Sequence, residues 1–194
     1  MDTEERFNAL YRAHHRAVLL YASRRTDADT ARDVVAETFL IAWRRLDSVP
    51  AGSGQAEPWL YGVARRVLAN AERSQRRTQR LAARMSRDSG DEALADPALV
   101  ISERQRVIQA LRRLPEPERE ALRLVGWDGL DLAGAALAMG CSRSAMAVRL
   151  HRARRRLESE LGAIDTSATD TGAIDTSDQR FGAQTQRVVQ HESR

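Results

Sequence analysis

The sequence predicts an all-α protein made of two small helical domains joined by a flexible linker, the second domain containing a helix-turn-helix. Apolar residues recur at the spacing of an α-helix through most of the 194 residues, and only 5% of the residues are aromatic. A polar, acidic stretch from Asp88 to about Ser102 interrupts that periodicity. We therefore expect a first domain over residues 1–87, a linker over 88–103, a second domain over 104–161 and a disordered tail over 162–194.

Two amphipathic helices are expected at the start of the first domain. One runs from Glu4 to about Arg25, and the next runs from Ala31 to Leu46 with apolar residues at i, i+3, i+4 and i+7 throughout. Leu40 and Ile41 fall outside the main apolar stripe, so the second helix is apolar on more than one face. Two interpretations remain open: a fully buried central helix, or a second face that docks onto a partner protein.

A loop and an arginine-rich helix complete the first domain. Prolines and glycines mark residues 48–58 as a loop, and a helix follows from Trp59 to about Arg87. Glu72 is the single acid among its many arginines, and Trp59 and Tyr61 stand at its start. Guanidinium groups bind phosphates, and aromatic rings stack on unpaired bases. The lopsided charge therefore favours single-stranded nucleic acid over a solvated arginine-rich surface.

The second domain contains the helix-turn-helix. Two helices are expected first, over residues 104–114 and 115–127. Asp131 can then cap a short helix of small residues, Gly140 supplies a tight turn, and Ser142 can cap a second helix rich in arginine. Such a motif places its second helix in the major groove of DNA. By pattern alone, a plain helical hairpin with a solvated basic face is the alternative.

Composition and missing motifs exclude several classes of protein. The formal net charge is +4, and the 31 basic residues are all arginine. Cys141 is the only cysteine, so neither an internal disulfide nor a cysteine cluster for zinc is expected. No apolar run is long enough to cross a bilayer and no signal peptide is visible, so we expect a cytoplasmic protein without membrane insertion. No motif of an active site is present, so we expect no enzyme activity, no cofactor and no catalytic or metal-binding residue.

Three segments carry a resemblance to a known family: RDVVAETFLIAWRRL, EPWLYGVARRVLAN, and LRRLPEPEREALRLVGWDGL with the helix-turn-helix and RLHRARRRL after it. They resemble, in this order, region 2.2, regions 2.3 to 2.4 and region 4 of bacterial sigma-70-family RNA polymerase sigma factors of the extracytoplasmic-function (ECF) group. The resemblance extends over roughly Phe7 to Leu161 and keeps the order and spacing of the family.

The resemblance implies a sigma factor that binds core RNA polymerase and directs promoter-specific initiation. Such a protein recognises the −35 and −10 promoter elements and aids DNA melting, here by holding a flipped base in the loop over residues 48–58. Its implied partners are the clamp helices and flap of the polymerase and promoter DNA, with an anti-sigma factor as a further candidate. The acidic linker would pass near the RNA path of the polymerase.

The resemblance also assigns residues to each contact. On the helix-turn-helix, the residues expected to face the −35 element are Arg143, Ser144, Ala147, Arg149 and Arg152. The residues expected beside the −10 element are Trp59, Tyr61, Arg65, Arg66 and Asn70. Those expected to bind the polymerase clamp are Arg32, Asp33 and Glu37.

The chain departs from the family at several positions. Ala36 stands in place of a common Gln, and Arg66 stands in place of a common Asn. In the helix-turn-helix, the usual paired acids are replaced by Ala133 and Gly134, and the typical Thr and Lys by Ala145 and Ala147.

Two other classes of protein compete with the sigma-factor interpretation. One is a freestanding helix-turn-helix regulator that binds duplex DNA without polymerase, and the other is a protein-binding adaptor of two helical bundles. A freestanding regulator does not require a clamp helix or an arginine-rich melting helix. An adaptor does not account for the positive charge of residues 59–87.

Overall fold

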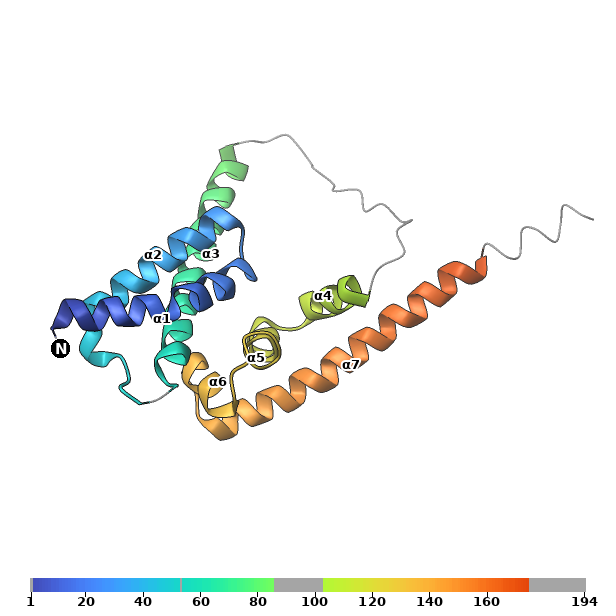
Figure 1. Ribbon diagram of the computed structural model, residues 1–194. Helices are drawn as coiled ribbons and strands as arrows, with labels where there is room; N and C mark the ends of the chain where they lie inside the picture. Colours follow the sequence, from blue (N-terminus) through green and yellow to red (C-terminus); the bar gives the residue numbers. More distant parts are fainter. Residues whose placement is uncertain (1, 53, 86–102, 175–194) are drawn as a thin grey trace, which may run out of the picture.

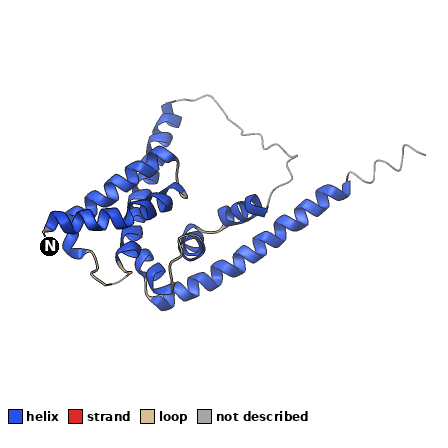
Figure 2. Ribbon diagram, viewed as in Figure 1, coloured by secondary structure: helices blue, strands red, loops and turns tan. Residues whose placement is uncertain are grey.

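The computed structural model describes residues 2–52, 54–85 and 103–174, and every regular element in these ranges is a helix (Figures 1 and 2). This confirms the all-α class with two helical domains. The expected linker, apart from Glu103, and residues 175–194 of the expected tail lie outside the described residues.

The first domain consists of α1 (Thr3–Ser23), α2 (Ala28–Arg44), the short 3-10 helix η1 (Leu46–Ser48) and α3 (Ala56–Met85). Both α1 and α2 begin at an aspartate that accepts hydrogen bonds from backbone N–H groups, which have no partner in the first turn of a helix. Asp2 forms a capping box with Glu5, and Asp27 accepts from the N–H groups of Asp29 and Thr30.

The second face of α2 is open to solvent. The helix buries Val34, Val35 and Phe39 against α1 and α3, yet Leu40 is 41% exposed and Trp43 is 42% exposed. The interpretation of a fully buried central helix is therefore wrong, and an apolar surface is left on the outside of the domain.

The second domain consists of α4 (Glu103–Arg113), α5 (Glu116–Gly126), α6 (Leu132–Met139) and α7 (Arg143–Ile174). Met146, Leu150 and Ala153 form the buried stripe of α7, which packs against α4, α5 and α6. The stripe continues beyond the expected end of the domain, because Ile164 is also buried. The expectation of a disordered tail from residue 162 is thus wrong for residues 162–174, which extend the helix.

The two domains pack directly against each other. Helix α6 lies along the first turns of α3, as Figure 1 shows, and one cluster of buried apolar residues runs through both domains. The approach is close enough that a Cβ added at Gly62 of α3 would lie 3.1 Å from the backbone oxygen of Ala138 in α6. A buried network of polar side chains, from Tyr21 and Arg25 to Glu120 and Asp128, joins α1 to α5 and the residues after it.

Candidate nucleic-acid interface

The helix-turn-helix is built by local signals in the sequence. Asp131 caps α6, its Oδ1 accepting from the Gly134 N–H at 2.7 Å. Gly140 ends the helix with φ of +62°, a left-handed conformation that glycine adopts without steric cost. Ser142 Oγ accepts from the Ala145 N–H at 3.1 Å at the start of α7. These three expectations from the sequence are confirmed.

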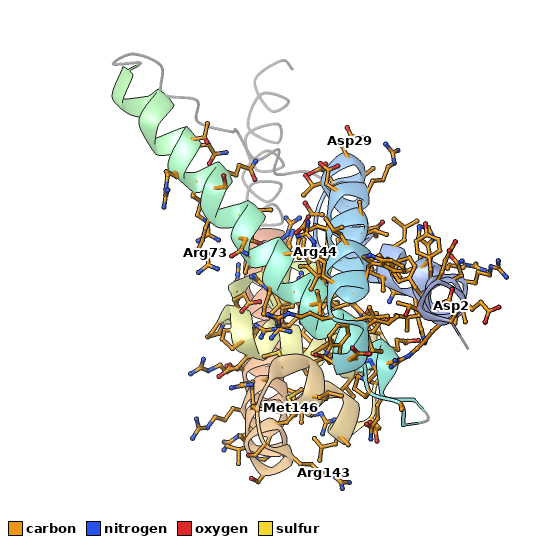
Figure 3. All side chains as sticks on the ribbon, turned by 90° about the vertical axis from the view of Figure 1, so that its left-hand side faces the viewer. Asp2, Asp29, Arg44, Arg73, Arg143 and Met146 are labelled. Atoms are coloured by element: carbon orange, nitrogen blue, oxygen red, sulfur yellow. The ribbon has the colours of Figure 1, made fainter. Side chains whose placement is uncertain are left out.

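The first turns of α7 present an outer face of mixed chemistry. Arg143, Ser144, Ala147 and Arg152 are exposed, and Figure 3 shows Arg143 at the tip of the motif, far from the end of α3. Arg149 is half-buried, with its Nη1 3.6 Å from the sulfur of Cys141. The opposite face holds Met146, which is buried in the core of the domain.

A groove of about 550 Å³ runs between this face and the start of α5. It is lined by Pro115 and Pro117 on one side and by Ser144, Val148 and Arg152 on the other. Sequence reasoning missed Val148, although the side chain is 52% exposed. An exposed aliphatic group on a helix in the major groove can contact the methyl group of thymine. The signal was present in the sequence, because Val148 follows Ser144 by four residues and therefore lies on the same face of the helix.

A second candidate surface lies between α2 and α3. A cavity of about 440 Å³ is lined by apolar and basic side chains, namely Ile41, Arg44, Arg45, Ser48, Trp59, Val63, Arg66, Val67 and Asn70. It brings together Trp59, Arg66 and Asn70 from the residues expected beside the −10 element. The sequence assignment missed Arg44, the last residue of α2, and Arg45, which follows it, because both meet α3 only in the folded chain.

Tyr61 and Arg65, the other residues expected beside the −10 element, lie elsewhere on α3. The Tyr61 ring is buried and stacks on Tyr21 at 4.6 Å between centroids, and its hydroxyl donates to Glu57 at 3.0 Å. Burial raises the pKa of Tyr61, so the hydroxyl stays protonated. Arg65 donates to the backbone oxygens of Ala138 and Met139, at 3.4 and 3.5 Å. Arg65 therefore faces the second domain, whereas the partners of Tyr61 belong to the first domain.

The residues expected to bind the polymerase clamp are on the outer face of α2. Arg32, Asp33 and Glu37 are all exposed, and Arg32 pairs with Asp29 at 2.9 Å. Beside them a groove of about 540 Å³ between α1 and α2 is lined by Tyr11, Leu19 and Val35 among others. Charged and apolar groups thus share this outer face with exposed Leu40 and Trp43.

The described part of the chain offers neither a cluster of metal ligands nor a membrane span. Among residues 2–52, 54–85 and 103–174, no group of three or more His, Cys, Asp or Glu side chains could hold a metal ion. None of the helices in these ranges is both long and apolar enough to span a membrane.

Comparison with known proteins places the chain in a family. Models of sigma-70 region 2 and sigma-70 region 4 match residues 10–78 and 104–157. The ECF RNA polymerase sigma factor EcfG of Rhodopseudomonas palustris is 34% identical over 148 residues, which are 75% of this chain and 80% of that protein. The chain belongs to the ECF sigma factors. SigL, an ECF sigma factor of Mycobacterium tuberculosis, is 29% identical over 77% of this chain and 85% of its own length.

Solved structures of sigma factors share this fold. The sigma factor RpoE of Bartonella quintana, in complex with the anti-sigma factor NepR, matches with a TM-score of 0.55 and 31% identity over 80% of this chain and 96% of that chain. CnrH, in complex with the cytosolic domain of CnrY, matches with a TM-score of 0.55 and 25% identity over 81% of this chain and 88% of that chain. The resemblance noted in the sequence is thereby confirmed.

Proposed function

We propose that this ECF sigma factor binds core RNA polymerase and directs initiation at promoters with a −35 and a −10 element. The observation that carries the proposal is the presence of both sigma regions in one chain, each with a surface suited to its part of the promoter. The helix-turn-helix suits duplex DNA, and the basic cavity with Trp59 suits an unpaired strand.

For the −35 element, the start of α7 would enter the major groove. Arg149 and Arg152 supply guanidinium groups that can bind phosphates or guanine. Ser144 supplies a hydroxyl that can donate to or accept from a base edge. Ala145 and Ala147 offer only methyl groups, so polar reading of bases rests on few side chains. We expect affinity at this element to depend on phosphate contacts more than on sequence.

For the −10 element, the cavity between α2 and α3 would bind an unstacked base of the melted strand. Trp59 provides an aromatic surface, Asn70 can hydrogen bond to a base edge, and Arg44, Arg45 and Arg66 can neutralise the flanking phosphates. Trapping the unpaired strand would shift the equilibrium towards melted DNA without chemistry by the protein.

The remaining partners are proteins. Arg32, Asp33 and Glu37, together with exposed Leu40 and Trp43, would contact the clamp helices of the polymerase, and the second domain would contact the flap. An anti-sigma factor is a further proposed partner, because RpoE, which is similar to this chain, was solved with the anti-sigma factor NepR. CnrH, which is also similar, was solved with the cytosolic domain of CnrY. We propose a cytoplasmic, regulatory role with no catalytic activity of its own.

Run-off transcription tests the proposal. Purified core polymerase is incubated with a pool of promoter fragments, with and without this protein, and the initiated fragments are sequenced. Initiation that depends on the protein, with a shared pair of elements in the selected fragments, is the expected result. Duplex binding without polymerase, and no initiation with it, would instead identify the freestanding regulator.

A further inference from the structure

A basic cavity of about 1130 Å³ lies beside α4 and α5, away from the residues assigned to DNA and to the polymerase clamp. Among the described residues that line it, five are arginines and Glu72 is the only acid. Glu72 already pairs with Arg76 at 2.8 Å, so it does not neutralise the arginines of the cavity. The volume is sufficient for a small-molecule ligand.

Two of the five arginines are neutralised by carboxylates of the protein. Arg25 donates to Glu120 at 2.9 Å and to Asp128 at 2.6 Å, and Arg24 donates to Asp128 at 2.9 Å. The side chain of Asp128 is only 1% exposed and Glu120 is 3% exposed. These two carboxylates are therefore occupied and cannot serve the other arginines of the cavity.

The other three arginines, Arg112 of α4 and Arg119 and Arg123 of α5, have no such counter-charge. In the part of the chain that the structure describes, no carboxylate forms an ion pair with any of them. The Nε atoms of Arg119 and Arg123 are enclosed and have no hydrogen-bond partner, and Nη1 of Arg119 reaches only the backbone oxygen of Arg112, at 3.4 Å. Because a guanidinium group stays charged, enclosing it without a partner is unfavourable.

Repulsion between like charges adds to this cost. Arg119 and Arg123 are one turn apart on α5, where two like charges destabilise a helix. Burial lowers the pKa of Arg123, and the positive charges of Arg25 and Arg119 lower it further. An anion in the cavity would offset the repulsion and would give the enclosed Nε groups an acceptor.

Trp127 adds an aromatic group to the same cavity. It is 38% exposed, and the Arg123 guanidinium lies 5.6 Å from the centroid of its ring. Guanidinium groups bind phosphate through paired hydrogen bonds, and an exposed indole ring can stack on a base. The unpaired charges are gathered in one cavity and do not follow a track along the surface, which fits a compact polyanion better than a long strand.

We propose that this cavity is a binding site for a nucleoside polyphosphate, with Arg112, Arg119 and Arg123 on the phosphates and Trp127 against the base. The site is separate from the surfaces assigned to the promoter and the clamp. Its test therefore uses the free protein and does not depend on the proposed function.

Calorimetric titration of the full chain with inorganic triphosphate tests the phosphate part of the site, in buffer without divalent cations. Arg119→Met and Arg123→Met each remove one guanidinium and keep an apolar stem, so each should weaken binding at least about tenfold. The matched control is Arg155→Met, at an exposed position of α7 that does not line the cavity, and it should bind like the wild type. Absence of triphosphate binding, or an equal loss in the control, would overturn the site.

Thermal unfolding separates a binding role from a structural one. Without ligand, Arg123→Met should melt no lower than the wild type, because it removes an enclosed charge that has no counter-charge. Triphosphate should raise the Tm of the wild type and of Arg155→Met, and should leave that of Arg123→Met nearly unchanged. A lower Tm of ligand-free Arg123→Met together with unchanged triphosphate affinity would show that Arg123 only supports the fold, and would overturn the proposal.

Titration with ATP tests the aromatic part of the site. Stacking on Trp127 should make ATP bind at least about fivefold more tightly than inorganic triphosphate, and Trp127→Ala should abolish that difference. Equal affinities of the wild type for ATP and triphosphate would overturn the assignment of the base to Trp127. A single-stranded oligonucleotide that binds more tightly than ATP and loses its affinity in Arg123→Met would identify a nucleic-acid site instead.

Discussion

At the scale of single residues, the chemistry of this protein is that of arginine. Each of the 31 basic residues is an arginine, so every positive charge comes with a planar donor group that can grip phosphate or guanine through two hydrogen bonds. The position of each guanidinium therefore decides its use. Arg152 is exposed at the groove beside α5, Arg149 is half-buried near Cys141, and Arg25 is buried in an ion-pair network.

Arg149 and Arg152 give the first prediction. Arg149→Ala and Arg152→Ala should each weaken binding of the holoenzyme to promoter DNA and reduce the slope of log affinity against log salt by about 0.9, the value for one phosphate on duplex DNA. Binding titrations at several salt concentrations measure the slope. Arg12→Ala, an exposed arginine of α1 away from both DNA surfaces, is the control and should leave the slope unchanged. Equal slopes of log affinity against log salt in all three variants would show that Arg149 and Arg152 do not contact phosphates.

Trp59 gives the second prediction. Stacking of one base on an aromatic side chain contributes about 1–3 kcal/mol, so Trp59→Ala should weaken binding of the holoenzyme to a single-stranded −10 oligonucleotide by about 5-fold to 150-fold. Trp59→Phe keeps an aromatic surface in the cavity and should retain most of the affinity. Fluorescence anisotropy of a labelled oligonucleotide measures both. A similar loss in both variants would indicate that packing, and not stacking on a base, is the role of Trp59.

At the scale of helices, caps decide where each element begins. Asp2, Asp27, Asp131 and Ser142 each accept a hydrogen bond from a backbone N–H at the start of a helix. The Asp27 carboxylate accepts from both the backbone and the hydroxyl of Thr30, at 3.0 and 2.7 Å, and these hydrogen bonds hold the pKa of Asp27 at about 2, below its ordinary value.

The cap of α2 should make the free energy of unfolding depend on pH under acidic conditions. Because the pKa of Asp27 is lowered in the folded chain, its contribution to stability is complete above pH 3.8 and is lost as the pH falls towards about 2. Asp27→Asn should make the free energy of unfolding less dependent on pH in this interval. Urea unfolding at a series of pH values measures it, with Asp33→Asn on the same helix as the control. An identical pH dependence in the wild type and Asp27→Asn would contradict the assignment.

The cap of α7 is open to a direct test of stability. Ser142→Ala removes the acceptor for the Ala145 N–H and should lower the free energy of unfolding by about 1 kcal/mol. Ser159→Ala, an exposed serine inside the same helix, should change it little. Thermal and urea unfolding compare the two variants. No difference between them would mean that water replaces the hydroxyl at no cost.

Local features of the fold were predictable from the sequence, and distant contacts were not. The caps at Asp131 and Ser142 and the turn at Gly140 follow from residues within one helical turn of each other, so the helix-turn-helix could be placed correctly. Tyr21 and Glu120 are 99 residues apart in the chain, and nothing in local periodicity connects them. For the same reason the sequence grouped Tyr61 with Trp59, although the fold turns the two to different neighbours.

At the end of α7 the prediction from local sequence was also wrong. The stretch after Leu161 is rich in Thr, Ser, Asp and Gly, which predicts no packed structure, yet Ile164 is buried. A chain that ends at Leu161 should therefore be less stable than one that ends at Ile174, by about 1.5–3 kcal/mol for the lost burial of one isoleucine. Urea unfolding of the two truncated chains measures the difference, and equal stability would show that this last part of α7 does not support the domain.

At the scale of the whole molecule, function depends on two surfaces held in one chain. If the holoenzyme reads both elements together, inserting about 5 base pairs between them turns one element to the opposite side of the duplex and moves it by about 17 Å. Initiation from the altered promoter should then fall at least about tenfold. Removal of a full turn, about 10 base pairs, is the control, because it changes the distance between the elements without rotating one relative to the other. A freestanding regulator would bind either promoter equally, because a single helix-turn-helix does not sense the distance to a second element. Initiation that does not depend on the spacing would show that the two domains bind their promoter elements independently of each other.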